Sequence, residues 1–179
     1  MTESYPPGCT IRTFPVGGLS KPNLLAKLAA NRIELNESAR RIIDSDQFLA
    51  SNFSKLVTTV ELAARDLGFP EGATTVAIHE NALDRRLCLC SLEVGPYFRL
   101  HHIDQPEGAK EEAVRRHRAP PGSITVASMP PSADDDFPKG FYVRRIDGVL
   151  WLRGYRASAD HVWDADDHFL FALRSTFPA

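Results

Sequence analysis

Residues 141–155 read FYVRRIDGVLWLRGY and predict a β-hairpin. The middle pair, Asp147-Gly148, is flanked by apolar residues. Asp-Gly in that setting favours a two-residue type I′ turn, because both central residues of the turn need positive φ. A turn of this length fixes the register of the two strands. The expected cross-strand pairs are Ile146 with Val149, Arg144 with Trp151, Tyr142 with Arg153, and Gly140 with Tyr155.

The register also sorts the hairpin side chains between two faces, since cross-strand partners share a face. One face is apolar and is the expected core side; it carries Phe141, Val143, Leu150 and Leu152, with Arg145 near the turn. The other alternates arginines with aromatic and aliphatic residues: Tyr142, Arg144, Ile146, Val149, Trp151, Arg153 and Tyr155. We call the second set the arginine-aromatic face.

The arginine-aromatic face is the predicted ligand site. Guanidinium groups bind phosphate or carboxylate in a fork, and Trp and Tyr rings offer stacking area. The expected binding residues are Arg144, Trp151, Arg153 and Tyr155, with Arg99 and His101 beside them if residues 97–103 join the same sheet. The expected partner is an anionic small molecule, a nucleic acid or a protein segment. In a competing interpretation helices cover this face, and the arginine stems lie across the rings with no ligand present.

Upstream of the hairpin, apolar residues recur at helical spacing. Helices are expected after the capping residues Ser20 and Asn36, over residues 54–67 up to Gly68, and from Thr74 to about residue 87. Residues 1–19, with several prolines and glycines, are expected to form an arm that is ordered only in part.

Downstream of Gly95-Pro96 the pattern changes. Residues 97–103 alternate as in a strand, residues 123–128 predict a short strand, and the charged run 110–118 is expected on the surface, as a helix of two turns. The predicted fold is therefore one α+β domain over residues 20–179, helical over 20–90 and sheet-forming over 96–175. Its N-terminal helices pack on a C-terminal, mainly antiparallel sheet that contains the type I′ hairpin.

Composition adds limits on the class of protein. The chain has 179 residues, 43% of them apolar, and a net charge of −2, which suits one globular domain. It begins with no signal-peptide pattern and has no apolar run of about 18 residues, so we expect a cytoplasmic protein with no membrane partner. The chain has three cysteines, Cys9, Cys88 and Cys90, which is an odd number, and no two of them have Cys-x-x-Cys spacing. They predict neither a disulfide framework nor a zinc site.

Motifs for chemistry are few. The sequence has no phosphate loop of the NTPase kind, no Gly-x-Ser-x-Gly elbow and no His-Glu-x-x-His pair. The main hypothesis is therefore a non-catalytic binding module with no cofactor and no metal. The alternative is a small hydrolase or metal-dependent enzyme that uses Asp134–Asp136 with His101, His161 or His168. Carboxylates and a histidine in one pocket would favour the alternative, and a covered arginine-aromatic face would count against the main hypothesis.

Two segments carry a resemblance. Residues 119–128, APPGSITVAS, and residues 134–154, DDDFPKGFYVRRIDGVLWLRG, resemble an uncharacterised family of small bacterial proteins. The resemblance extends over residues 24–172. It implies the fold and brings no activity with it.

Overall fold

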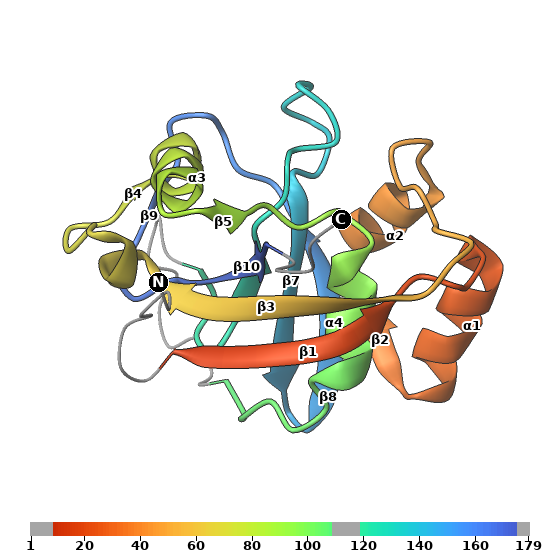
Figure 1. The fold of residues 1–179 in the computed structure, drawn as a ribbon. Helices are drawn as coiled ribbons and strands as arrows, with labels where there is room; N and C mark the ends of the chain where they lie inside the picture. The colour runs from red at the N-terminus through yellow and green to blue at the C-terminus, as the bar shows by residue number, and fades with distance from the viewer. Residues whose placement is uncertain (1–8, 109–118, 175–179) are drawn as a thin grey trace.

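The computed structural model describes residues 9–108 and 119–174, which form a curled eight-stranded sheet, a two-stranded sheet and four α-helices (Figure 1). The predicted α+β class is confirmed. In chain order the elements are β1 (Thr10–Val16), α1 (Lys21–Ala30), β2 (Ile33–Leu35), α2 (Glu37–Asp44), β3 (Lys55–Ala63), the 3-10 helix η1 (Ala64–Leu67), β4 (Ala73–Thr74), α3 (Thr75–Asp84), β5 (Leu87–Cys88), α4 (Val94–His101), β6 (Ile124–Val126), β7 (Gly140–Ile146), β8 (Val149–Tyr155), β9 (Val162–Trp163) and β10 (His168–Leu173).

The large sheet has the strand order β1-β3-β10-β6-β7-β8-β2, with β5 also paired to β10. The β10–β6 and β2–β8 pairs are parallel, and the other pairs are antiparallel. The sheet is therefore mainly antiparallel, as predicted. Strands β4 and β9 form the small sheet.

The hairpin has the predicted register. All four expected pairs occur between β7 and β8. Asp147 has φ 51° and Gly148 has φ 76°, so both central residues have the positive φ that a type I′ turn requires. The carboxylate of Glu107 accepts a hydrogen bond from the backbone N–H of Gly148, 3.2 Å to Oε2.

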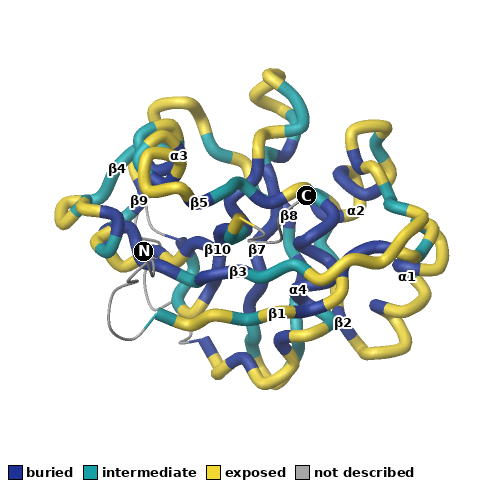
Figure 2. Tube along the Cα trace, viewed as in Figure 1, coloured by how far each residue is buried: buried dark blue, intermediate teal, exposed yellow. Residues whose placement is uncertain are grey.

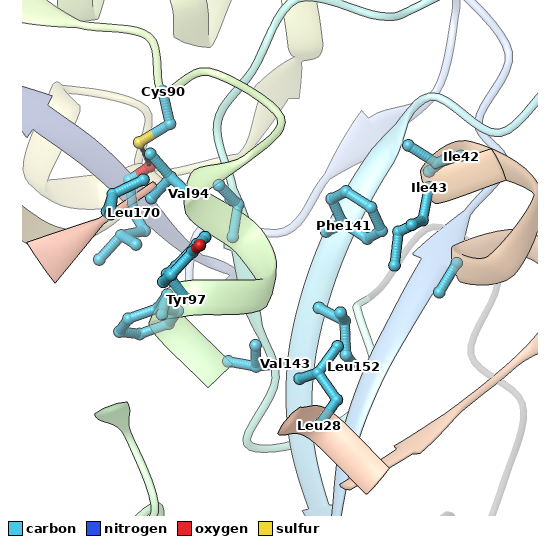
Figure 3. Close-up of a cluster of buried hydrophobic side chains, with 14 of the residues drawn as sticks. Leu28, Ile42, Ile43, Cys90, Val94, Tyr97, Phe141, Val143, Leu152 and Leu170 are labelled. Atoms are coloured by element: carbon cyan, nitrogen blue, oxygen red, sulfur yellow. Dashed lines mark hydrogen bonds between the residues drawn. The ribbon is translucent and has the colours of Figure 1, made fainter. Parts of the chain in front are cut away.

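One side of the sheet, the helix-covered face, packs against α1, α2 and α4. Figure 3 shows the centre of this core, where Phe141, Val143 and Leu152 of the hairpin lie between side chains of the three helices. The predicted core role of these three residues is confirmed, since all are fully buried; Leu150 is partly buried. The helix residues in this core are Leu24 and Leu28 of α1, Ala39, Ile42 and Ile43 of α2, and Val94, Tyr97 and Phe98 of α4.

The other side of the sheet is covered as well, over part of its area. A second core joins Val60, Leu62, Phe169 and Phe171 of the strands to α3, η1 and Trp163. As Figure 2 shows, the central strands are consequently buried over most of their length, while β1 and the loops are more exposed.

Three helix predictions are confirmed, two of them with the predicted cap, and the helix expected to reach about residue 87 ends at Asp84, before strand β5. The Ser20 side chain accepts a hydrogen bond from Asn23 N at the start of α1, and Asn36 accepts one from Ala39 N at the start of α2. Thr74 caps α3 in the same way, through Ala77 N. These caps are encoded within a single turn of sequence, which is why they are predictable.

Two predictions of secondary structure are wrong. Residues 55–63 form strand β3, because the β-branched run Val57-Thr58-Thr59-Val60 suits a strand and burial on both sides removes a simple alternation. Residues 94–101 form helix α4, in which Pro96 lies in the first turn, where proline is tolerated. The strand predicted at 97–103 is not formed, and of the helix predicted at 54–67 only residues 64–67 are helical, as η1.

The predicted division of the chain also needs correction. Residues 10–16, expected in the arm, form the edge strand β1, where Pro15 is compatible with an edge position. Strands β2, β3 and β5 lie within the supposedly helical part, and α4 lies near the start of the supposedly sheet-forming part. The charged run 110–118 lies outside the described residues.

Candidate functional site

The arginine-aromatic face divides into a covered and an open part. Arg144 is buried, with 4% of its surface exposed. Tyr155 packs edge-on against Trp163, with ring centroids 5.6 Å apart, and burial raises its pKa. Arg153 is half-buried and lies over the rings of Trp151 and Tyr142, at 5.3 and 6.0 Å. The structure therefore brings together Tyr142, Trp151 and Arg153, and it withdraws Arg144 from the surface.

The other two predicted binding residues do not belong to this face, because their segment is helical. Arg99 is fully buried, and its guanidinium donates to Gln105 Oε1 and to the backbone carbonyl of His102. Burial lowers the pKa of Arg99 to about 10. His101 is exposed and stacks on Phe14 at 5.5 Å. Arg99 thus holds the end of α4 to the following loop and faces no ligand surface.

A cleft of about 490 Å³ lies beyond the C-terminal end of α4, on the helix-covered face of the sheet. Several segments far apart in the sequence contribute to its wall. Its polar side chains are Thr10, Arg12, Glu61, His102, Gln105, Glu107, Ser123, Asp166, Asp167 and His168.

Glu61 links two cationic side chains in this cleft. Its Oε2 accepts from Arg12 at 2.9 Å, and its Oε1 lies 2.9 Å from His168 Nδ1. Neighbouring strands position the three residues, since Ala63 pairs with His168, and Arg12 pairs with Thr59. Burial works to raise the pKa of Glu61, but the hydrogen bonds from His168 and Arg12 outweigh it and leave the pKa below 4.5. The hydrogen bond to Glu61 raises the pKa of His168 above 6.5, against the effect of burial.

His102 lies on another wall of the cleft in a different environment. It caps α4, stacks on Phe98 at 5.2 Å, and its Nδ1 lies 3.1 Å from Asp104 Oδ1. Burial lowers the pKa of His102, and the charges of Arg12 and Arg99 act in the same direction, while Asp104 opposes them.

The remaining carboxylates of the cleft have partners of their own. Asp166 pairs with Arg65, and Glu107 lies 3.4 Å from Arg145 Nε. Asp167 accepts from the backbone N–H groups of Ala119 and Asp164, at 3.1 and 2.8 Å. Glu61 contacts two cationic side chains among the residues that the structure describes. When His168 is protonated, the Arg12–Glu61–His168 cluster has one positive charge in excess.

Ser123 adds a polar group to the cleft wall. Its hydroxyl oxygen is buried and makes no hydrogen bond with any residue that the structure describes. A buried hydroxyl without a partner is costly, and this oxygen is too deeply enclosed to count as a ligand contact.

The other candidate clusters do not form a site of this kind. Asp134–Asp136 lie in an exposed loop, where Asp134 accepts from Asp136 N and Asp135 lies 3.7 Å from Lys139 Nζ. His161 packs against the Trp163 ring at 4.6 Å and does not line the cleft. Within residues 9–108 and 119–174, no three His, Cys, Asp or Glu side chains are grouped so as to hold a metal ion.

Of the cleft residues, the sequence analysis had singled out only His168 as a candidate for chemistry. It missed Arg12, Glu61 and His102 as site residues. Arg12 was assigned to an arm, Glu61 belonged to a supposed helix, and His102 was not among the candidate residues. The local signal that could have revealed β1 is apolar spacing of two: Phe14 and Val16 share a strand face with Arg12, while Thr13 and Pro15 lie on the other.

No helix in the described part of the chain combines the length and apolar character needed to cross a membrane. No protein-family model, curated protein or solved structure matches this chain.

Proposed function

We propose that this protein is a binding module whose cleft takes a small anionic molecule, held by Arg12 and protonated His168. The observation that supports the proposal is the sharing of one carboxylate, Glu61, between these two cations. Each of the two keeps hydrogen-bond donors that Glu61 does not use, since guanidinium has five N–H groups and imidazolium has two.

Size and surroundings are consistent with a small ligand. A volume of about 490 Å³ lies within the range of roughly 300–1,000 Å³ that is usual for small-molecule sites. A phosphate or carboxylate group suits a guanidinium fork. Because the excess charge depends on His168, the affinity for an anion should fall as the pH rises above 6.5.

Arg153 is a second candidate for anion binding. Its guanidinium lies over the Trp151 and Tyr142 rings and forms no ion pair with the described residues. This is what remains of the predicted arginine-aromatic site. Its weakness is that Arg144 does not lie on the surface with it.

Isothermal titration calorimetry with inorganic phosphate at pH 6 tests both sites in one series. Arg12→Gln removes the cleft cation, Arg153→Gln removes the hairpin cation, and Arg40→Gln removes an exposed arginine of α2 as a matched control. We expect Arg12→Gln to weaken phosphate binding about 10- to 100-fold, the usual value of a hydrogen bond to a charged group. The two other variants should bind as the wild type does.

The alternatives give distinct results. Loss of binding in Arg153→Gln with full binding in Arg12→Gln would move the anion site to the hairpin. Equal effects of all three substitutions would indicate non-specific attraction, and absence of phosphate binding to the wild type would refute the proposal for the cleft.

A further inference from the structure

The cleft contains two histidines whose surroundings are opposite in character. His168 begins β10 and donates towards a carboxylate shared with Arg12, with 48% of its side chain exposed. His102 ends α4, is almost fully buried, and has the arginines Arg12 and Arg99 nearby. Each uses Nδ1 to contact a carboxylate, Glu61 or Asp104, which leaves Nε2 for another partner.

We propose that this cleft hydrolyses a small phosphodiester, with His102 as general base, His168 as general acid and Arg12 as the group that holds the phosphate. The inference rests on the proposed binding of an anion in the cleft and adds a reaction to it. A phosphodiester has a single negative charge, which the one excess positive charge of the Arg12–Glu61–His168 cluster attracts, while the Asp167 carboxylate in the same cleft acts against it.

The step is a hydrolysis with water as the only co-reactant. Neutral His102 takes a proton from water as the water oxygen forms a bond to phosphorus. The bond between phosphorus and the leaving oxygen breaks, and protonated His168 gives its proton to that oxygen. The products are a phosphomonoester and an alcohol. His102 then loses its proton to solvent and His168 regains one, so the protein returns to its initial state.

The environments of the two histidines support this assignment of roles. His168 faces Glu61, Asp66 and Asp166, which favour its protonated form. His102 faces Arg12 and Arg99, which favour its neutral form, with Asp104 acting against them. Pairs of titratable groups whose pKa values are shifted apart are typical of acid–base catalysis. The pH–rate profile should be bell-shaped, rising below pH 6.5 as His102 loses its proton and falling above pH 6.5 as His168 loses its own.

Glu61 and Asp104 are positioning residues in this scheme. Glu61 keeps His168 protonated and oriented, and Asp104 fixes the ring of His102 through Nδ1. Asp104→Asn should therefore shift the ascending limb of the pH profile to lower pH, because the carboxylate raises the pKa of His102. A merely structural role of Asp104 would leave that limb in place.

The test uses the full chain and two probes that differ in their leaving groups, bis(4-nitrophenyl) phosphate and diphenyl phosphate. His168→Gln should lower kcat/KM for diphenyl phosphate about 10²- to 10⁴-fold, the usual range of general acid–base catalysis. It should have a much smaller effect with bis(4-nitrophenyl) phosphate, whose leaving group needs little protonation. His102→Gln should impair both probes equally, since base catalysis does not depend on the leaving group.

His101→Gln is the matched control, because His101 neighbours His102 but does not line the cleft. It should leave both rates unchanged. His102 is buried, so the melting temperature of each variant is recorded, and Asp104→Asn provides an independent test if His102→Gln does not fold. Asp104 itself is exposed.

The outcomes separate the two proposals. If phosphate binds in an Arg12-dependent way but neither diester is hydrolysed faster by the wild type than by His168→Gln, the catalytic inference is wrong and the binding proposal stands. If both diesters are hydrolysed with the same sensitivity to His168→Gln, His168 is not the general acid. If phosphate does not bind, the binding proposal fails at its own test.

Discussion

The hairpin and the cleft both hold arginines near a possible anion site, but they are built in opposite ways. The hairpin comes from 16 consecutive residues, 140–155, whose turn fixes every cross-strand pair. The Arg12–Glu61–His168 cluster joins three strands, β1, β3 and β10, that lie far apart in the sequence. In the hairpin, the residues of the turn determine which side chains lie beside one another. In the cleft, only the assembled sheet brings the three side chains together.

This difference limits what a local pattern can say about function. The register placed Arg144 and Arg153 on one face, and the structure has that register. Yet Arg144 is buried and Arg153 is half-exposed, because other segments cover only part of the face. Sharing a face is a property of the hairpin, whereas exposure is a property of the whole fold.

The largest expected effect comes from the two arginines of the hairpin. Arg144→Ala should lower the free energy of unfolding by about 1–3 kcal/mol, because it truncates a buried side chain and leaves the groups that it contacts without their partner. Arg153→Ala should cost about 0.5–1 kcal/mol, the value of a cation–π contact at an exposed site. Urea unfolding of both variants measures the difference. Equal losses would mean that the two positions are not distinguished by burial.

The turn should show a smaller effect of purely local origin. Gly148 has φ 76°, and no atom lies within 4 Å of the position that a Cβ would take. Gly148→Val should therefore destabilise the fold by about 1–2 kcal/mol through backbone strain alone. Gly148→Asn is the control, since asparagine tolerates the left-handed region. An unchanged melting temperature in Gly148→Val would contradict the type I′ assignment.

Features set within a turn or two of sequence could be predicted: the hairpin register, the caps Ser20 and Asn36, the helix start at Thr74, and the core role of Phe141, Val143 and Leu152. Strand β3 could not, because burial on both faces hides its alternation. The error at β3 carried over to the site. With 54–67 taken as a helix, Glu61 had no strand neighbours, and its contacts with Arg12 and His168 could not be anticipated.

The smallest expected effect tests the cleft through the pH dependence of stability. Glu61 has a lowered pKa, so its contribution is present above pH 4.5 and is lost as the pH falls through its folded-state pKa. His168 has a raised pKa, so its contribution is complete below pH 6.5 and is lost as the pH rises through its folded-state pKa. The cluster should therefore stabilise the fold most between pH 4.5 and 6.5.

Glu61→Gln measures that contribution by urea unfolding between pH 4 and 9. Relative to the wild type, Glu61→Gln should lose the most free energy of unfolding between pH 4.5 and 6.5. The part of that loss that comes from the contact between Glu61 and His168 should remain below about 1 kcal/mol, because 48% of the His168 side chain is exposed. Above pH 6.5 Glu61→Gln should still be less stable than the wild type, because in the wild type Arg12 stays charged and keeps its hydrogen bond to Glu61. Glu71→Gln, at an exposed loop position, should show no such window. A loss for Glu61→Gln that is constant across pH would mean that His168 and Glu61 do not interact in solution, and the hairpin would then be the better candidate for the anion site.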